Sequence, residues 1–216
     1  MKLEPDVTMP TMPQRSVRTA DESPRRLTLE EWAALPEDEP GELCRGELVE
    51  EEVPDYVHEV VVGWLIHMFR GWVAPQGGLV GGSEAKFGVG ADRGRKPDVT
   101  VYLPASTKPP RRGVVRVPPD IAVEVLSPDA RHVRRDRLEK MEEYAAFGIR
   151  FYWIVDPDAR TVEMFELGAD RRYARALGAA EGLLGDVPGC PGLSLNLSDL
   201  WAETDRLGRN DPQQVQ

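Results

Sequence analysis

Cysteine and long apolar runs are both scarce in this sequence. Its 216 residues include two cysteines, Cys44 and Cys190, which stand alone and lack the paired spacing of a zinc site. Two free thiols in a reducing, cytoplasmic setting are the better interpretation. No apolar run approaches the roughly 20 residues of a membrane-spanning helix, and the N-terminus lacks the apolar segment of a secretory signal. We therefore expect a globular, cytoplasmic protein without a membrane segment.

The sequence predicts one domain between two tails. Residues 1–26 combine prolines with Thr, Ser, Met and Arg and show no apolar period, which is typical of a disordered tail. Residues 204–216 are polar and are expected to form a flexible C-terminal tail. The domain then covers residues 27–203, a length that suits a single core.

Helical periodicity marks four segments. Thr28 and Glu31 form the pattern of a capping box at the start of a short helix that Pro36 ends. Longer helices are predicted over 55–73 and over 129–147, with Gly148 after the second, and a short last helix lies near Trp201. Their predicted buried positions are Leu29, Trp32 and Ala33; Val57, Val61, Trp64, Leu65, Met68 and Trp72; and Val133, Leu138, Met141, Tyr144 and Ala145.

Strand signals lie between these helices. A two-residue hairpin is predicted at Arg45–Gly46, a strand pair within 78–90, and single strands within 96–104 and 120–126. Residues 150–157 and 161–167 are predicted to pair across the Asp156–Arg160 turn, and weaker strand signals follow. Strands and helices in this order predict a mixed α/β sandwich around a central sheet.

Charge is unevenly distributed along the chain. The net charge is -10, which by itself argues against a polyanionic partner. Residues 28–52 contain ten acids and Arg45 as the one base, whereas residues 106–137 contain eight bases and four acids. Local charge matters more than the total when a polyanion is steered to a site, so the basic segment keeps nucleic acid open as a partner. The alternative is that both segments are solvated surfaces.

Glu124 is out of place in an otherwise apolar strand. A buried carboxylate costs several kcal/mol, by order of magnitude, unless it is paired, protonated or bound to a metal. Asp98 opens the preceding strand, and antiparallel pairing of the two strands would bring the two acids together. Two adjacent carboxylates need a shared proton or cation, and Mg²⁺ prefers carboxylate oxygen. Asp120, on the same strand face as Glu124, is the less favoured second ligand.

Lys140 is the third group of this predicted site. It lies at the edge of the apolar stripe of the helix over 129–147, so its ammonium could reach over the end of the sheet. A lysine beside a metal orients or deprotonates a water, or neutralises charge that develops on a phosphate. Asp98, Glu124 and Lys140 around Mg²⁺ are the groups that phosphodiester hydrolysis requires.

Four segments follow one another in a recognisable order: "GELCRGELVE", "KPDVTVYL", "DIAVEVLSPDARHVRRDRLEKMEEYAAFGIRFYWIVDP" and "TVEMFEL". Together they resemble the Uma-two family of endonucleases, a branch of the PD-(D/E)XK restriction-endonuclease-like superfamily, and the similarity covers roughly residues 27–202. The resemblance implies an α/β (α+β) fold of restriction-endonuclease-like type, with a central mixed β-sheet flanked by helices. It also implies a DNA endonuclease that uses Mg²⁺ or Mn²⁺ and works as a homodimer with one site for each strand.

The resemblance also implies roles for individual residues. Asp98 matches the aspartate of the PD motif and Glu124 the acid of the second half-motif. Leu126 stands where the motif lysine is usual, and Lys140 on the following helix matches the position to which that role moves in this family. Glu42, ahead of the hairpin turn, and His58, at the start of the long helix, match further family positions that would support the site.

Other interpretations stay open at this point. The arginines Arg131, Arg134, Arg135 and Arg137 either contact phosphates or form a solvated helix start. The acidic segment 28–52 favours a catalytically inactive module that keeps the fold and binds nucleic acid or protein. In a third interpretation the carboxylates only form ion pairs within a structural scaffold.

Overall fold

A six-stranded mixed sheet forms the centre of the protein. The computed structural model describes residues 26–36, 41–50, 54–128 and 134–208. The strands run in the order β10–β9–β8–β7–β6–β3, and each neighbouring pair is antiparallel except β7 and β8, which are parallel. This arrangement confirms the predicted fold class. The strands are β3 (Leu79–Gly81), β6 (Val99–Tyr102), β7 (Ile121–Val125), β8 (Phe151–Asp156), β9 (Thr161–Leu167) and β10 (Tyr173–Ala179).

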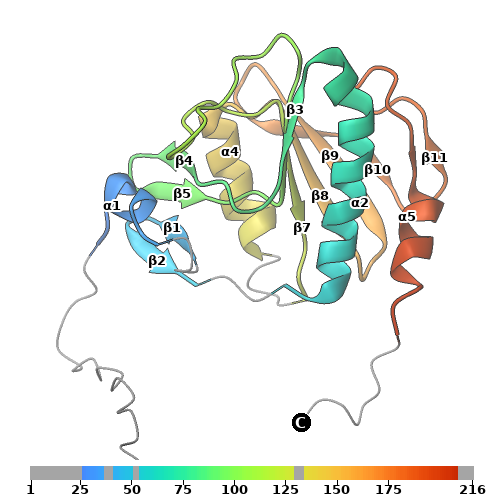
Figure 1. The fold of residues 1–216 in the computed structure, drawn as a ribbon, viewed down its shortest axis with the longest axis horizontal. Helices are drawn as coiled ribbons and strands as arrows, with labels where there is room; N and C mark the ends of the chain where they lie inside the picture. Colours follow the sequence, from blue (N-terminus) through green and yellow to red (C-terminus); the bar gives the residue numbers. More distant parts are fainter. Residues whose placement is uncertain (1–25, 37–40, 51–53, 129–133, 209–216) are drawn as a thin grey trace, which may run out of the picture.

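Each face of this sheet is covered by a different layer (Figure 1). Helices α2 (Tyr56–Val73) and α5 (Leu197–Thr204) lie on one face, and α4 (Met141–Phe147) lies on the other. The alternation along β7 divides its side chains between the layers, since Ile121, Val123 and Val125 belong to the core under α2, and Ala122 and Leu126 to the core under α4. The period of two in the sequence thus predicted the faces of β7 correctly.

The parallel pair β7–β8 determines where α4 begins. Parallel neighbours cannot be joined by a tight turn and need a crossover connection. Helix α4, with the π-helical turn η2 (Arg135–Lys140) in front of it, belongs to this crossover, and it ends at Gly148, which adopts a left-handed φ of 101°. The start of the crossover helix therefore lies near the carboxyl end of β7, where Glu124 is.

A second, four-stranded sheet packs beside α4. Its strands are β2 (Glu47–Val49), β1 (Glu42–Cys44), β5 (Arg93–Arg95) and β4 (Phe87–Gly90), in that order. The hairpin turn predicted at Arg45–Gly46 is confirmed, with left-handed φ values of 54° and 82°. Helix α1 (Leu29–Ala33) starts with the predicted capping box between Thr28 and Glu31.

Trp32 fixes α1 on this small sheet. Its ring is fully buried directly above Gly94, where a Cβ atom would lie 2.3 Å from the ring. Its indole Nε1 donates a hydrogen bond to the carbonyl oxygen of Gly41 at 3.2 Å. Only a glycine at this position of β5 lets the ring approach so closely.

The prediction that two strands within 78–90 pair with each other is wrong. Both strands form, but β3 pairs with β6 at the edge of the large sheet, whereas β4 pairs with β5 in the small one. The glycines and Ser83 between them separate the strands instead of closing a hairpin, and the hydrogen-bonding partners come from later in the chain. The predicted pairing of residues 150–157 with 161–167 is confirmed as β8 and β9, and the last helix is α5. The remaining elements are η1 (Ala74–Gln76), β11 (Leu183–Leu184) and β12 (Leu195–Asn196).

Two helices face inward as predicted but differ from the prediction at some buried positions. In α2, Val61 and Leu65 are buried as expected, but Phe69 and Val73 complete the buried stripe in place of Met68 and Trp72, which are only partly buried. In the segment 134–147, Leu138 is 56% exposed, although an inward position was predicted for it. Asp136 and Lys140 are buried in its place, because Lys140 forms ion pairs with Asp136 and with Glu124 of the sheet.

The ends of the chain and three short internal segments, residues 37–40, 51–53 and 129–133, are not part of this description. Residues 1–25 and 209–216, which contain most of the predicted tails, lie outside the described residues, as do Val133 and Arg131. Within the described ranges, no helix combines the length and apolarity that crossing a membrane requires.

Substitution of Gly94 tests the packing of α1 on the small sheet. Gly94→Ala should lower the free energy of unfolding by about 1–3 kcal/mol, because the new Cβ overlaps the Trp32 ring. Gly63→Ala is the matched control: Gly63 is exposed in α2 with open space around it, so alanine should stabilise the helix by up to about 1 kcal/mol. Urea denaturation measures both. Equal effects of the two substitutions would contradict this packing.

Candidate active site

Strand pairing brings Asp98 and Glu124 together. Strands β6 and β7 are antiparallel with Val99 opposite Val123, so the residue before Val99 lies beside Glu124. Asp98 Oδ2 accepts a hydrogen bond from the main-chain N–H of Val125 at 2.7 Å. The sequence predicted this pairing of strands and of acidic faces correctly.

Asp120 lies at the other end of β7 and has a different environment. Its Oδ2 accepts a hydrogen bond from Leu103 N–H at 2.7 Å, and its Oδ1 accepts one from the Ser106 hydroxyl at 2.8 Å. Both bonds hold the loop after β6. The geometry thus brings Asp98, and not Asp120, to Glu124.

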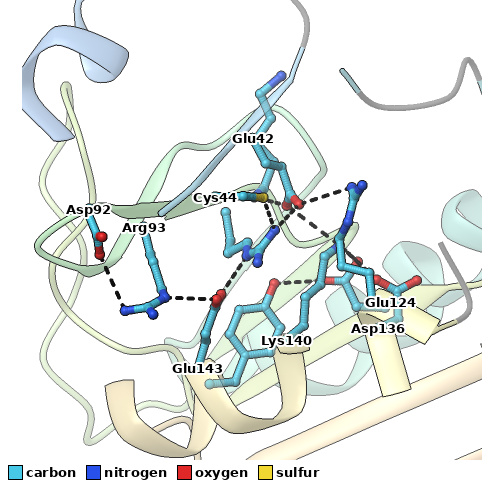
Figure 2. A network of polar contacts seen from close by, with 12 residues as sticks. Glu42, Cys44, Asp92, Arg93, Glu124, Asp136, Lys140 and Glu143 are labelled. Atoms are coloured by element: carbon cyan, nitrogen blue, oxygen red, sulfur yellow. Dashed lines mark hydrogen bonds and ion pairs between the residues drawn. The ribbon is translucent and has the colours of Figure 1, made fainter. Parts of the chain in front are cut away.

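The ammonium of Lys140 is the centre of a buried cluster of carboxylates (Figure 2). Its Nζ lies 2.8 Å from Glu124 Oε2, 3.1 Å from Asp136 Oδ1 and 3.6 Å from Glu42 Oε1. The Lys140 side chain is only 6% exposed. The structure thus places Lys140 at the end of the sheet as predicted, but enclosed by acids and not at the edge of an apolar stripe.

Tyr144 completes the environment of Glu124. Its hydroxyl donates a hydrogen bond to Glu124 Oε1 at 2.6 Å, so both oxygens of this carboxylate have a partner. Asp136, Lys140 and Tyr144 follow one another at intervals of four residues and therefore share one face of the helical segment. Asp136 and Tyr144 were not identified as site residues from the sequence, although this spacing from Lys140 is a signal that could have found them.

Burial and neighbouring charges have opposing effects on the pKa of each of these groups. Burial raises the pKa of Glu124 well above its usual value, against the effect of Lys140. Burial also raises the pKa of Asp136. For Lys140, burial would lower the pKa, but Asp136, Glu124 and Glu42 outweigh it and raise it well above the usual value. Lys140 is therefore a fixed positive charge that several carboxylates share.

Glu42 belongs to this cluster through the small sheet. Its Oε2 accepts a hydrogen bond from Arg95 Nη1 at 2.7 Å, and its Oε1 accepts one from the main-chain N–H of Lys96 at 3.0 Å. Burial alone would raise the pKa of Glu42, but Lys140 and Arg95 lower it to about 2. Glu42 is therefore ionised and connects the hairpin β1–β2 to the end of the large sheet.

Arg95 extends the network from Glu42 to α4. The side chain is completely buried, and its Nε donates to Glu143 Oε2 at 2.6 Å. Its Nη1 also lies 3.1 Å from the sulfur of Cys44, which is one of two free thiols in the described chain. Figure 2 shows the network continuing from Glu143 to Arg93 and Asp92. Arg95 was not identified as a site residue from the sequence, because an arginine in a short polar strand gives no signal of its burial.

His58 supports Asp98 from the first turns of α2. Its Nε2 lies 3.2 Å from Asp98 Oδ2, and its Nδ1 lies 3.5 Å from Glu59 Oε1. Burial would lower the pKa of His58, but the hydrogen bond and charge of Asp98 raise it above the usual value. The structure therefore brings His58 to the pair of strands, as the family resemblance implied.

These residues surround a small pocket of about 150 Å³. Asp98, Glu124, Lys140 and His58 line it, together with residues from the loop after β3 and from η2; the further lining residues are Pro54, Glu59, Ser83, Glu84, Lys96, Val125, Ser127, Arg135 and Asp136. This volume admits a hydrated ion and a phosphate group but not a whole nucleotide. Any larger substrate must place its other parts outside the pocket.

The basic run contributes one side chain to this pocket. Arg135 lines it, is 15% exposed, and has its Nη1 3.9 Å from Glu42 Oε2. Arg137 instead forms an ion pair with Glu163 on β9. Arg134 is exposed, and Arg131 lies outside the described residues. Of the three described arginines, only Arg135 is in a position to meet a group bound in the pocket.

The donor set fits a hard divalent cation held partly by water and substrate. Among the described residues, no three His, Cys, Asp or Glu side chains form a complete metal cage. Mg²⁺, however, usually keeps several waters and binds through one or two carboxylates plus substrate phosphate. Asp98 and Glu124 supply two carboxylates on one wall of the pocket. Asp98 Oδ1 has no hydrogen-bond partner within the described ranges, so it is available to a ligand.

Comparisons with known proteins identify a family and a similar fold. The model of the family Uma2, described as "Putative restriction endonuclease", matches residues 28–198. A solved structure from Anabaena variabilis, titled a putative nuclease belonging to DUF820, is similar with a TM-score of 0.66 and 23% identity. The match covers 82% of this chain and 98% of that one, and at this identity it shows the fold alone. No curated protein matches.

Removal of the Lys140 charge should be far more costly than removal of a surface charge. Lys140→Met should lower the free energy of unfolding by about 3–5 kcal/mol, because it leaves buried carboxylates without their cation. Arg206→Met is the matched control: it breaks an exposed pair with Glu203, worth at most about 1 kcal/mol. Chemical denaturation of both variants measures the difference.

The double variant Lys140→Met/Glu124→Gln tests the coupling inside the cluster. It should be less destabilised than the sum of its two single variants, because the neutral amide no longer needs the ammonium. Additive effects would show that Lys140 and Glu124 are not coupled.

Proposed function

The chain belongs to the Uma2 family, and from this premise we propose that it is an endonuclease that hydrolyses phosphodiester bonds in DNA with Mg²⁺ as cofactor. The observation that carries the proposal is the pair of carboxylates, Asp98 and Glu124, on neighbouring strands at one small polar pocket. The pocket has the size of a phosphate and an ion, and its cationic side chains suit an anionic substrate.

Asp98 and Glu124 are the residues that would hold the metal. Mg²⁺, when bound there, supplies Lewis-acid polarisation of the phosphate and activation of a water. The protein fixes both carboxylates beforehand, since Glu124 is held by Lys140 and Tyr144 and Asp98 by His58 and the Val125 N–H. Such preorganisation avoids reorientation during the reaction.

The remaining site residues act around this pair. Lys140 orients Glu124 and supplies a permanent positive charge beside the pair of carboxylates. Glu42 holds Lys140 from the opposite side, and His58 orients Asp98. Arg135 is placed to contact a phosphate oxygen in the pocket. A homodimer would supply two such sites for the two strands of a duplex.

A catalytically inactive interaction module is the second candidate. Two exposed carboxylates at the pocket, those of Glu59 and Glu84, favour it because they would repel a phosphate backbone. Such a module would bind nucleic acid or protein without cleaving it, and its binding would survive the loss of Glu124.

Cleavage of plasmid and single-stranded DNA with Mg²⁺ or Mn²⁺ tests the proposed activity. Glu124→Gln and Asp98→Asn should each lower the rate of cleavage by about 100-fold or more, because each removes a charged oxygen from the metal. Asp120→Asn is the matched control, an acid of the same strand face at the far end of β7, and should retain cleavage. Thermal denaturation confirms that all three variants are folded.

The outcomes separate the two candidates. No cleavage by the wild-type protein with either metal, or equal cleavage by Glu124→Gln, would refute the endonuclease. DNA binding without cleavage that is unchanged in Glu124→Gln would support the inactive module.

A further inference from the structure

The side chain of Lys96 is largely covered by the protein, but its ammonium has few partners there. Its side chain is 9% exposed, and its single ion pair among the described residues joins Nζ to Glu84 Oε2 at 3.5 Å. The Glu84 side chain is itself 82% exposed, so this contact is worth little. An ammonium has three donors, and one contact with an exposed carboxylate leaves most of this capacity for a ligand.

The ammonium of Lys140, by contrast, has several close partners within the protein. Carboxylates of Glu124, Asp136 and Glu42 surround its ammonium at 2.8–3.6 Å. Its donors are thus engaged by the protein, and it has none left to turn toward a substrate phosphate. The pocket therefore contains one lysine that holds the acids in place and one lysine that is open to an anion.

Lys96 lies at the junction of two hollows. It lines the pocket of about 150 Å³ with Asp98 and Glu124, and it also lines a larger hollow of about 730 Å³ beside α1. Glu84 is the other side chain common to both. The larger hollow has a mixed lining, whose apolar side chains are Ala33, Leu35, Pro36, Ala85 and Val114. Lys86 also lines it, but its ammonium donates to the main-chain oxygens of Trp32 and Leu35 at 3.2 and 3.1 Å.

The main chain fixes Lys96 in this position. Its N–H donates to Glu42 Oε1 at 3.0 Å, so the residue is anchored to the same carboxylate that faces Lys140. Pro97 and Asp98 follow directly. A phosphate at Lys96 would therefore lie close to one at the carboxylate pair, which is the relation between successive phosphates of one strand.

We propose that Lys96 binds the substrate phosphate adjacent to the scissile one, and that the nucleotide attached to it occupies the hollow beside α1. This inference rests on the proposed function and adds to it the path of the substrate. Apolar side chains beside the ammonium of Lys96 suit a nucleotide, whose base can pack on apolar surface and whose phosphate is anionic. Lys96 is in this view a substrate-binding residue, and Lys140 is a positioning residue.

The binding of a short fluorescein-labelled oligothymidylate tests this role without any cleavage. Anisotropy titrations in EDTA, at several salt concentrations, give the affinity and its salt dependence. Lys96→Gln should weaken binding about tenfold and reduce the salt slope by about 0.7–1, because one phosphate contact is lost. Lys96→Arg should retain both values. Arg111→Gln is the matched control, an exposed cation in the loop before β7 that lines neither hollow.

The results distinguish this inference from the proposed function. Unchanged affinity and slope in Lys96→Gln, or no binding by the wild-type protein, would overturn the role of Lys96. Wild-type cleavage with unchanged Lys96→Gln binding would overturn it while the endonuclease stands. Binding that depends on Lys96 without cleavage by the wild-type protein would support the phosphate contact and refute the hydrolysis.

Discussion

The ion pair between Lys140 and Glu124 is the interaction on which the rest of the site depends. Glu124 is 2% exposed in the central strand of the large sheet, where a carboxylate is tolerated only with strong partners. Lys140 supplies the opposite charge, and Asp136, Glu42 and Tyr144 complete the surroundings of the pair. The small sheet, α4 and β7 therefore meet at one point because each contributes a member of this cluster.

The fold around the cluster follows from simple rules. The parallel pair β7–β8 requires a crossover, and the crossover helix begins close to the end of β7. Antiparallel pairing of β6 and β7 brings Asp98 to Glu124. The hairpin β1–β2 then closes the open side with Glu42, whose contact with Arg95 extends the network to Glu143 on α4. A stable buried charge cluster thus joins the two sheets.

The sequence was most informative where a feature depends on one strand, one turn or two consecutive strands. Four such predictions are confirmed: the faces of β7, the antiparallel strand beside Glu124, the hairpin at Arg45–Gly46 and the capping box of α1. Leu138 was misplaced because hydrophobicity alone orients a helix toward its apolar face, whereas here Asp136 and Lys140 face inward. The burial of Arg95 and the position of Lys96 depend on contacts with Glu42 and Glu143, which lie far away in the sequence, so no single segment predicts them.

A crystal structure of the protein soaked in Mn²⁺, with anomalous scattering to locate the ion, tests the central claim most directly. The account predicts one strong anomalous peak between the carboxylates of Asp98 and Glu124, in the pocket lined by Lys96 and Arg135. An empty pocket at saturating Mn²⁺, with Lys140 still bound to Glu124, would contradict it. The acids would then be a structural ion-pair cluster and not a metal site.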